Sequence, residues 1–207
     1  RRLVAAGAIG EVTGIHCDFF LDPHFGGFRE QMAHVLLLDM AIHTFDAARF
    51  VADDAAVSVY AEEWNPQASW YARDSSALAS FRFANGAVFT YRGSWCAPGF
   101  RTSWESAWRI TGTGGTILWD GADDIRAEQA LPPVAGKLLP DTETLAIPAL
   151  DPADRIGGHL GVITDFIAAT RGGPVPETVG RENIKSLAMV LGAMDSSAQG
   201  RRVEIVI

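Results

Sequence analysis

The sequence has 207 residues, of which 48% are hydrophobic and 20% are charged, and it carries a formal net charge of −8. That length and composition are typical of a soluble globular domain that can bury a sizeable core, and they exclude a disordered or fibrous chain. The acidic balance argues against a nucleic-acid partner, because a nucleic-acid groove needs clustered Lys and Arg.

Cysteine usage and hydropathy indicate a cytoplasmic protein with no membrane partner. Cys17 and Cys96 have no CxxC spacing and no Cys/His cluster around them, so we expect two reduced thiols and no metal site. No apolar run reaches the roughly 18 residues that a membrane-spanning helix needs. No signal-peptide pattern opens the sequence.

The first third of the chain predicts a strand, a loop and a buried helix. The strand is expected over Glu11–Phe20, and the glycine-broken stretch Asp22–Gly27 is expected to form a loop. The strongly apolar segment Val35–Val51 predicts a helix that Asp53 and Asp54 close.

Strands dominate the middle of the chain, and two helices follow them. Strands are expected at Val57–Trp64, Ser75–Phe83, Ala87–Trp95, Glu105–Thr111, Gly115–Trp119, Ile125–Glu128 and Thr144–Ile147. Leu131–Pro140 contains three prolines and predicts an exposed excursion. Amphipathic helices are expected at His159–Arg171 and Arg181–Gln199, before a last strand at Arg202–Ile207. Because strands and helices do not alternate, the class is α+β with a long, mainly antiparallel sheet.

The dipeptide Asn85-Gly86 predicts a tight hairpin, since both residues tolerate positive φ. A two-residue loop would pair Arg82 with Phe89 and would place Phe89 and Tyr91 on the sheet face opposite Phe81. Both faces would then be rich in apolar groups and would need a cover. We therefore expect a homo-oligomer in which a second subunit covers part of one face, unless the substrate cleft does so.

Ionisable residues interrupt the apolar helix, among them Asp39, His43 and Asp46. At the period of an α-helix, spacings of four and seven place them within about 60° of one another, so they form one polar stripe. Burying a carboxylate without a partner costs free energy, so we expect the stripe to have a structural or functional role.

The stripe alone leaves several interpretations open. It could be a helix cap or an internal salt-bridge network, and an i, i+4 Asp/His pair would also suit a metal site or a hydrolase. The functional interpretation that we favour is an acid/base unit facing a cleft, in which a histidine exchanges protons near neutral pH beside an orienting carboxylate. Oxidation of a secondary alcohol needs such a proton acceptor.

Ordered motifs along the chain narrow these options. Leu38–Arg49 resembles the L-x-D-x-G-x-H-x-x-D-x-x-R signature of the Gfo/Idh/MocA oxidoreductases. Other segments that resemble the C-terminal domain of this family are Gly7–Val12, Phe83–Ala87, Ile110–Gly115, His159–Phe166 and Ser196–Val203. Each motif is weak, but their order over nearly the whole chain is specific.

The resemblance implies an open, mainly antiparallel sheet with helices on one face, like the C-terminal domain of dihydrodipicolinate reductase. It implies that residues 1–207 form a substrate-binding and oligomerisation domain of an NAD(P)-dependent sugar or polyol dehydrogenase. By resemblance His43 is the catalytic proton acceptor, Asp39 is its catalytic partner, and Asp46 faces substrate hydroxyls.

The cofactor, NAD or NADP, is expected to bind mainly to a Rossmann domain that these residues lack. No G-x-G-x-x-G fingerprint and no Glu-Lys-Pro motif, which would carry the family's catalytic lysine, occurs in the sequence. The glycines at Gly112–Gly115 are expected to form a hairpin turn instead.

Residues of the loop before the helix are further candidates for substrate binding. They are Asp22, His24 and Arg29, together with His34, which stands where the family usually has glycines. An ordinary surface loop is the alternative for the first three. The alternative for the whole chain is a non-catalytic module that binds carbohydrate or forms oligomers. We expect the 207 residues alone to be inactive, because hydride transfer needs a bound nicotinamide.

Overall fold

The computed structural model describes residues 1–149, 157–176 and 178–207. Its strands are β1 (Val12–Phe20), β2 (Ala56–Trp64), β3 (Ser76–Phe83), β4 (Val88–Ser94), β5 (Ala107–Gly112), β6 (Gly115–Trp119), β7 (Ile125–Ala130), β8 (Thr142–Thr144) and β9 (Val203–Glu204). They form one sheet in the order β8-β7-β6-β5-β1-β4-β3-β2-β9. Among these pairs only β1 and β4 run parallel, so the prediction of an α+β, mainly antiparallel sheet is confirmed.

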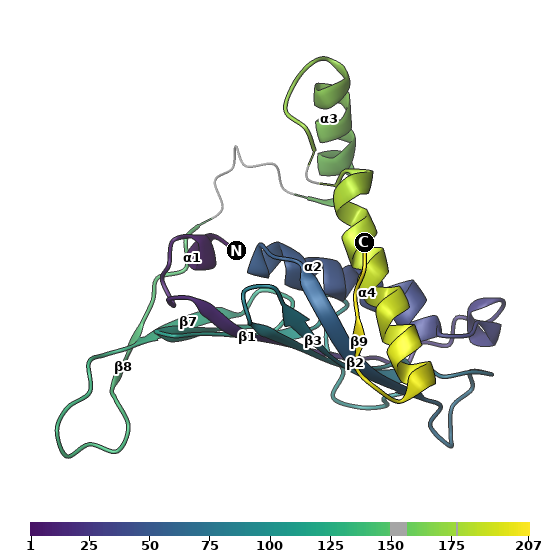
Figure 1. Ribbon diagram of the computed structural model, residues 1–207, viewed down its shortest axis with the longest axis horizontal. Coiled ribbons are helices and arrows are strands. Elements are labelled where there is room, and N and C mark those ends of the chain that lie inside the picture. Colours follow the sequence, from purple (N-terminus) through teal and green to yellow (C-terminus); the bar gives the residue numbers. More distant parts are fainter. Residues whose placement is uncertain (150–156, 177) are drawn as a thin grey trace.

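The helical segments lie on one side of this sheet (Figure 1). They are α1 (Arg2–Ala5), the 3₁₀ turn η1 (Arg29–Gln31), the π-helical segment η2 (Leu36–Ala41), α2 (Ile42–Ala52), α3 (Gly158–Thr170) and α4 (Gly180–Gln199). None of the helices in the described ranges combines the length and hydropathy needed to cross a bilayer.

Most element bounds lie within two residues of those predicted. The strand expected at Thr144–Ile147 was placed too late, because β8 pairs with β7 over Thr142–Thr144. The last strand is shorter than expected, and α1 and η1 had no prediction. Leu131–Pro140 is exposed throughout, as predicted.

An aromatic core joins α2 to the middle of the sheet. The Phe45 ring lies fully buried on α2, with its centroid 4.7 Å from that of Phe81 and 5.3 Å from that of Tyr91. Phe81 and Phe89 stack on neighbouring strands at 5.5 Å. Edge-to-face and offset pairs of this kind stabilise a core beyond the area that they bury.

The β3–β4 hairpin corrects the predicted register. Phe81 pairs with Phe89 and Arg82 with Val88, so the aromatic side chains share the inner face. The reason is the loop, which contains Ala84 as well as Asn85 and Gly86, and Gly86 takes a φ of 91°. Such a three-residue loop moves the register by one residue, and one residue reverses the face of every side chain. The outer face is therefore more polar than expected.

Helix α4 packs against β2 and α2 and completes the edge of the sheet. Strand β9 pairs with β2 only at Ser58 and Val59. Beyond that point the backbone N–H groups of Ala61 and Glu63 donate to hydroxyl oxygens on α4 at 2.9 and 3.0 Å. The hydroxyl groups, from Ser196 and Ser197, satisfy backbone N–H donors that an edge strand would otherwise leave without a hydrogen-bond partner.

Candidate functional site

The helix that carries the polar stripe begins as a π-helix. The expected α-helix starts only at Ile42, and Asp39 lies in the preceding segment η2. π-helical turns are rare and occur frequently at functional sites. The wider turn changes the direction of Asp39 relative to the residues that follow, so the spacing argument for one continuous stripe does not hold.

Asp39 is held by an arginine from the preceding loop. Arg29 Nε lies 3.1 and 3.0 Å from the two carboxylate oxygens of Asp39, whose side chain is 21% exposed. The Arg29 guanidinium also lies over the rings of Phe25 and Phe28, at 5.2 and 5.1 Å from their centroids. The charge of Asp39 is thus compensated by a fixed cation beside an aromatic surface.

His43 lies one turn further on, and its residue is exposed. Within the part of the chain that the structure describes, its imidazole has no hydrogen bond or ion pair, and neither Asp39 nor Asp46 is bonded to it. The ring is therefore accessible to a ligand, but its orientation is not fixed by these residues.

Asp46 faces α4 rather than His43. Ser186 Oγ donates to Asp46 at 2.6 Å, and Arg49 Nη1 lies 2.7 Å from the same hydroxyl. Arg49 is 11% exposed, its Nη2 lies 3.6 Å from Glu182, and its buried Nε has no partner within the described ranges. Asp46 is thus one member of a charged network that joins α2 to α4.

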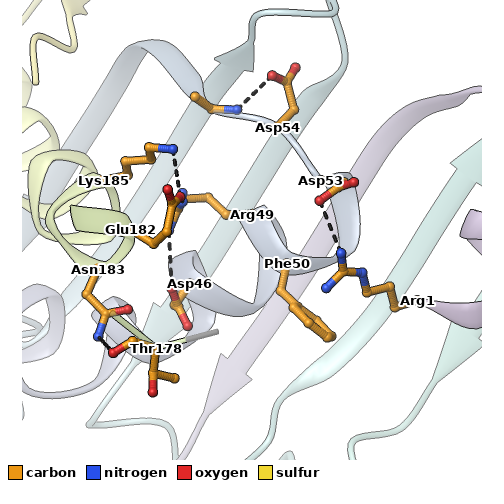
Figure 2. A pocket seen from close by; sticks show the side chains of 11 residues that line it. Arg1, Asp46, Arg49, Phe50, Asp53, Asp54, Thr178, Glu182, Asn183 and Lys185 are labelled. Atoms are coloured by element: carbon orange, nitrogen blue, oxygen red, sulfur yellow. Dashed lines mark hydrogen bonds and ion pairs between the residues drawn. The ribbon is translucent and has the colours of Figure 1, made fainter. Parts of the chain in front are cut away.

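This network opens onto a cavity of about 650 Å³ between the end of α2 and the start of α4. Figure 2 shows Asp46 and Arg49 from α2 opposite Glu182 and Lys185 from α4. Lys185 donates to Glu182 at 2.7 Å, and this hydrogen bond lowers the pKa of the Glu182 carboxyl. Neither Asp39 nor His43 lines this cavity.

The candidate binding residues of the loop each contact a partner. Asp22 pairs with Arg101, with Arg101 Nε 2.5 Å from its carboxylate. The His24 ring stacks on Trp70 with the centroids 3.7 Å apart, and Trp70 Nε1 donates to the carbonyl of Pro23 at 3.2 Å. These contacts give the loop a defined shape, and they leave Phe25 40% exposed beside it.

His34 forms a hydrogen bond with a buried carboxylate, which the sequence did not predict. Its Nδ1 lies 2.7 Å from Glu63 Oε2, and the Glu63 side chain is only 2% exposed. Burial raises the pKa of Glu63, and the hydrogen bond from His34 opposes that shift. A signal for Glu63 was present, since it follows Val59 and Ala61 at the inward positions of β2, where a carboxylate interrupts an apolar alternation.

The glycine-rich turn at Gly112–Gly115 joins two antiparallel strands and does not open a helix. The glycine turn between β5 and β6 is a hairpin, as predicted, and the carbonyl of Ile9 packs so closely on Gly112 that a Cβ there would lie 2.1 Å from its oxygen. A diphosphate would need free backbone N–H groups at a helix start. In the described ranges, no three His, Cys, Asp or Glu side chains gather as a metal site.

Comparison with known proteins identifies relatives along the whole chain. A family model described as the GFO/IDH/MocA C-terminal domain matches residues 1–118. An uncharacterized protein, y4oX, from Sinorhizobium fredii is 30% identical over 99% of the chain and 58% of its own length. The 1,5-anhydro-D-fructose reductase of Ensifer adhaerens is 24% identical over 99% of the chain and 59% of its own length.

A solved structure has the same fold. Levoglucosan dehydrogenase in complex with NADH and levoglucosan superposes with a TM-score of 0.74 at 21% identity, over 99% of this chain and 62% of that one. The chain therefore spans less than two thirds of the length of these relatives.

Proposed function

This chain belongs to the Gfo/Idh/MocA family of oxidoreductases, and on that premise we propose that it forms the substrate side of an NAD(P)-dependent dehydrogenase or reductase. Residues 1–207 would serve as the substrate-binding and oligomerisation domain. The observation that carries the proposal is the accessible His43 on the family's signature helix, one turn after the Arg29–Asp39 pair.

His43 would act as the proton acceptor for a substrate hydroxyl. Oxidation of a secondary alcohol releases a hydride from carbon and a proton from oxygen, and the nicotinamide cofactor supplies the chemistry for the hydride. An exposed neutral imidazole can accept that proton near neutral pH. Asp39, paired with Arg29, would be the catalytic partner of His43 and lies one turn earlier on the same helix.

The substrate would be a cyclic sugar, polyol or related hydroxy compound. The names of two relatives, 1,5-anhydro-D-fructose reductase and levoglucosan dehydrogenase, support anhydro sugars as the first class to test. Asp46, held by Ser186, would accept hydrogen bonds from substrate hydroxyls. Asp22, His24, Arg29 and His34 would shape the binding loop, with the exposed ring of Phe25 as an apolar wall.

The cofactor would bind mainly outside the described residues, since the glycine-rich turn at Gly112–Gly115 is a β-hairpin and not the start of a helix. We expect NADH titrated into the 207-residue chain to leave the nicotinamide fluorescence unchanged and the chain to be inactive alone. Tight binding of NADH by this chain would contradict this part of the proposal.

The outer face of the sheet would contact a second copy. None of the described helices packs on this face (Figure 1), and it carries the part-exposed rings of Tyr60 and Trp64 beside Arg82 and Arg92. Sedimentation of the full-length protein tests this proposal, and a monomer at high concentration would contradict it.

The proposed role of His43 predicts a large loss of turnover in the full-length protein. With levoglucosan and NAD⁺ or 1,5-anhydro-D-fructose and NADPH, His43→Ala should lower kcat by about 10²–10⁴-fold, the range for loss of a general base. Asp39→Asn should lower kcat less, because it removes a charge but not the proton acceptor. Asp195→Asn, on the exposed side of α4, is the control. Near-normal turnover of His43→Ala would rule out His43 as the proton acceptor.

A further inference from the structure

A hydrogen bond between His34 and Glu63 joins a buried carboxylate to an accessible imidazole. Nδ1 of His34 lies 2.7 Å from Glu63 Oε2, and the two side chains are 34% and 2% exposed. Glu63 comes from the end of β2, whereas His34 lies two residues before η2. The pair therefore connects the sheet to the start of the segment that carries Asp39.

The backbone at His34 is held in an unfavourable conformation. Its φ is 54°, in the left-handed region that non-glycine residues rarely adopt. The carbonyl of His34 accepts a hydrogen bond from the Leu38 backbone N–H at 2.9 Å, which fixes this residue at the entry to η2. A glycine would adopt the same conformation without strain, so the backbone alone does not explain the imidazole.

Burial of the Glu63 carboxylate is energetically unfavourable, and a purely structural contact would not require it. Burial raises the pKa of its carboxyl, nearby Asp74 raises it further, and the hydrogen bond to His34 opposes both effects. The second carboxylate oxygen, Oε1, is buried and has no hydrogen-bond partner within the described ranges. Strain at His34 together with an incompletely satisfied carboxylate is the combination that accumulates at functional sites.

We propose that His34 and Glu63 form a positioning dyad for the substrate, in which Glu63 accepts the Nδ1–H of His34 and leaves Nε2 free to accept a hydrogen bond from a substrate hydroxyl. This assignment rests on the proposed function, because it presumes a polyhydroxylated substrate beside Asp39. A carboxylate behind a histidine fixes both the tautomer and the orientation of the ring. The dyad would select substrates that place a hydroxyl at Nε2 but would not take the reacting proton, which His43 accepts.

Kinetics of the full-length protein separate binding from backbone effects. Asn and Gly both tolerate the left-handed region, so His34→Asn and His34→Gly keep the local fold and remove the imidazole. Both should raise KM for levoglucosan about tenfold, the effect of one lost hydrogen bond, with kcat within about twofold of the parent. Glu63→Gln should raise KM less, because its amide can still contact the ring, and Asp195→Asn, on the exposed side of α4, is the control. If KM for levoglucosan stays normal in His34→Gly, any defect of His34→Asn comes from the backbone and not from the lost imidazole. That result would overturn the proposal.

Nitrogen NMR of the full-length protein with ¹⁵N-labelled histidine tests the geometry directly. We expect neutral His34 to carry its proton on Nδ1, Glu63→Gln to change that tautomer balance, and levoglucosan to shift the His34 Nε2 resonance. A proton found on Nε2 would overturn the dyad. If levoglucosan shifts the resonances of His43 but not those of His34, the dyad alone is overturned. If levoglucosan shifts the resonances of neither histidine, both the proposed substrate class and the dyad are overturned.

Discussion

At the scale of single residues, burial decides how Glu63 responds to pH. Its pKa in the folded chain is raised by burial, so the folded state binds more protons than the unfolded state over a range that begins near the ordinary glutamate pKa of about 4.3. Stability contributed by this group is therefore lost as the pH rises through that range. The hydrogen bond from His34 limits this loss of stability because it lowers the pKa of Glu63.

This linkage gives a measurable prediction for Glu63→Gln. An amide cannot ionise, so the variant should lack the decline, and its unfolding midpoint relative to the parent should rise as the pH increases above about 4.3. Thermal unfolding at a series of pH values measures this difference, with Glu62→Gln on the exposed side of the same strand as the control. Parallel curves for Glu63→Gln and the parent would show that the carboxyl has no raised pKa.

Single residues also show where sequence reasoning ends. The spacing of Asp39, His43 and Asp46 identified the helix that carries the family signature. It did not predict Ser186 as the partner of Asp46 or Glu63 as the partner of His34, because helical periodicity describes only one element and these partners come from distant segments. Nor does periodicity distinguish a π-helical turn at Leu36–Ala41 from an α-helical one, since both present an apolar surface.

At the scale of elements, the length of a turn decides which side chains the following strand places on the inner face of the sheet. The strand positions of the β3–β4 hairpin could be predicted from alternation, but the inclusion of Ala84 in the loop could not, since Asn85-Gly86 suits loops of two and three residues. That one residue brings Phe81 and Phe89 onto the inner face. The predicted apolar outer face was wrong for this reason.

The β5–β6 hairpin offers a test of such a turn. A Cβ at Gly112 would lie 2.1 Å from the carbonyl oxygen of buried Ile9, which is itself held by the backbone N–H of Gly114 at 2.8 Å. Gly112→Ala should therefore lower the free energy of unfolding by about 1–3 kcal/mol, as overpacking does. Chemical denaturation measures the change. Gly180→Ala, where a Cβ meets open space at the start of α4, should leave stability unchanged or higher, and an equal effect of both variants would contradict the packing argument.

At the scale of the whole molecule, α3 differs from the other long helices. It has no buried residue, and Leu160, Ile163 and Phe166 are 78%, 55% and 64% exposed. Figure 1 shows it projecting away from the sheet, beyond the start of α4. Its amphipathic pattern predicted the helix correctly, but its apolar face is not covered by the residues that the structure describes.

Hydrogen exchange should separate these helices in the 207-residue chain. Helices with few buried contacts open at low free energy, so amides of α3 should exchange much faster than those around Met189 and Ala193, which are buried in α4. Mass spectrometry of peptides from the exchanged protein measures both rates. Equal protection of α3 and central α4 would show that α3 packs against the chain in solution.

His43 is proposed to contact the reacting hydroxyl of a sugar-type substrate. A crystal structure of the full-length protein with NADH and levoglucosan would show this contact. We expect the oxygen at the reacting carbon roughly 2.6–3.2 Å from an imidazole nitrogen of His43, the reach of a general base. A substrate bound only in the cavity between α2 and α4, out of reach of His43, would overturn the proposed role of this residue.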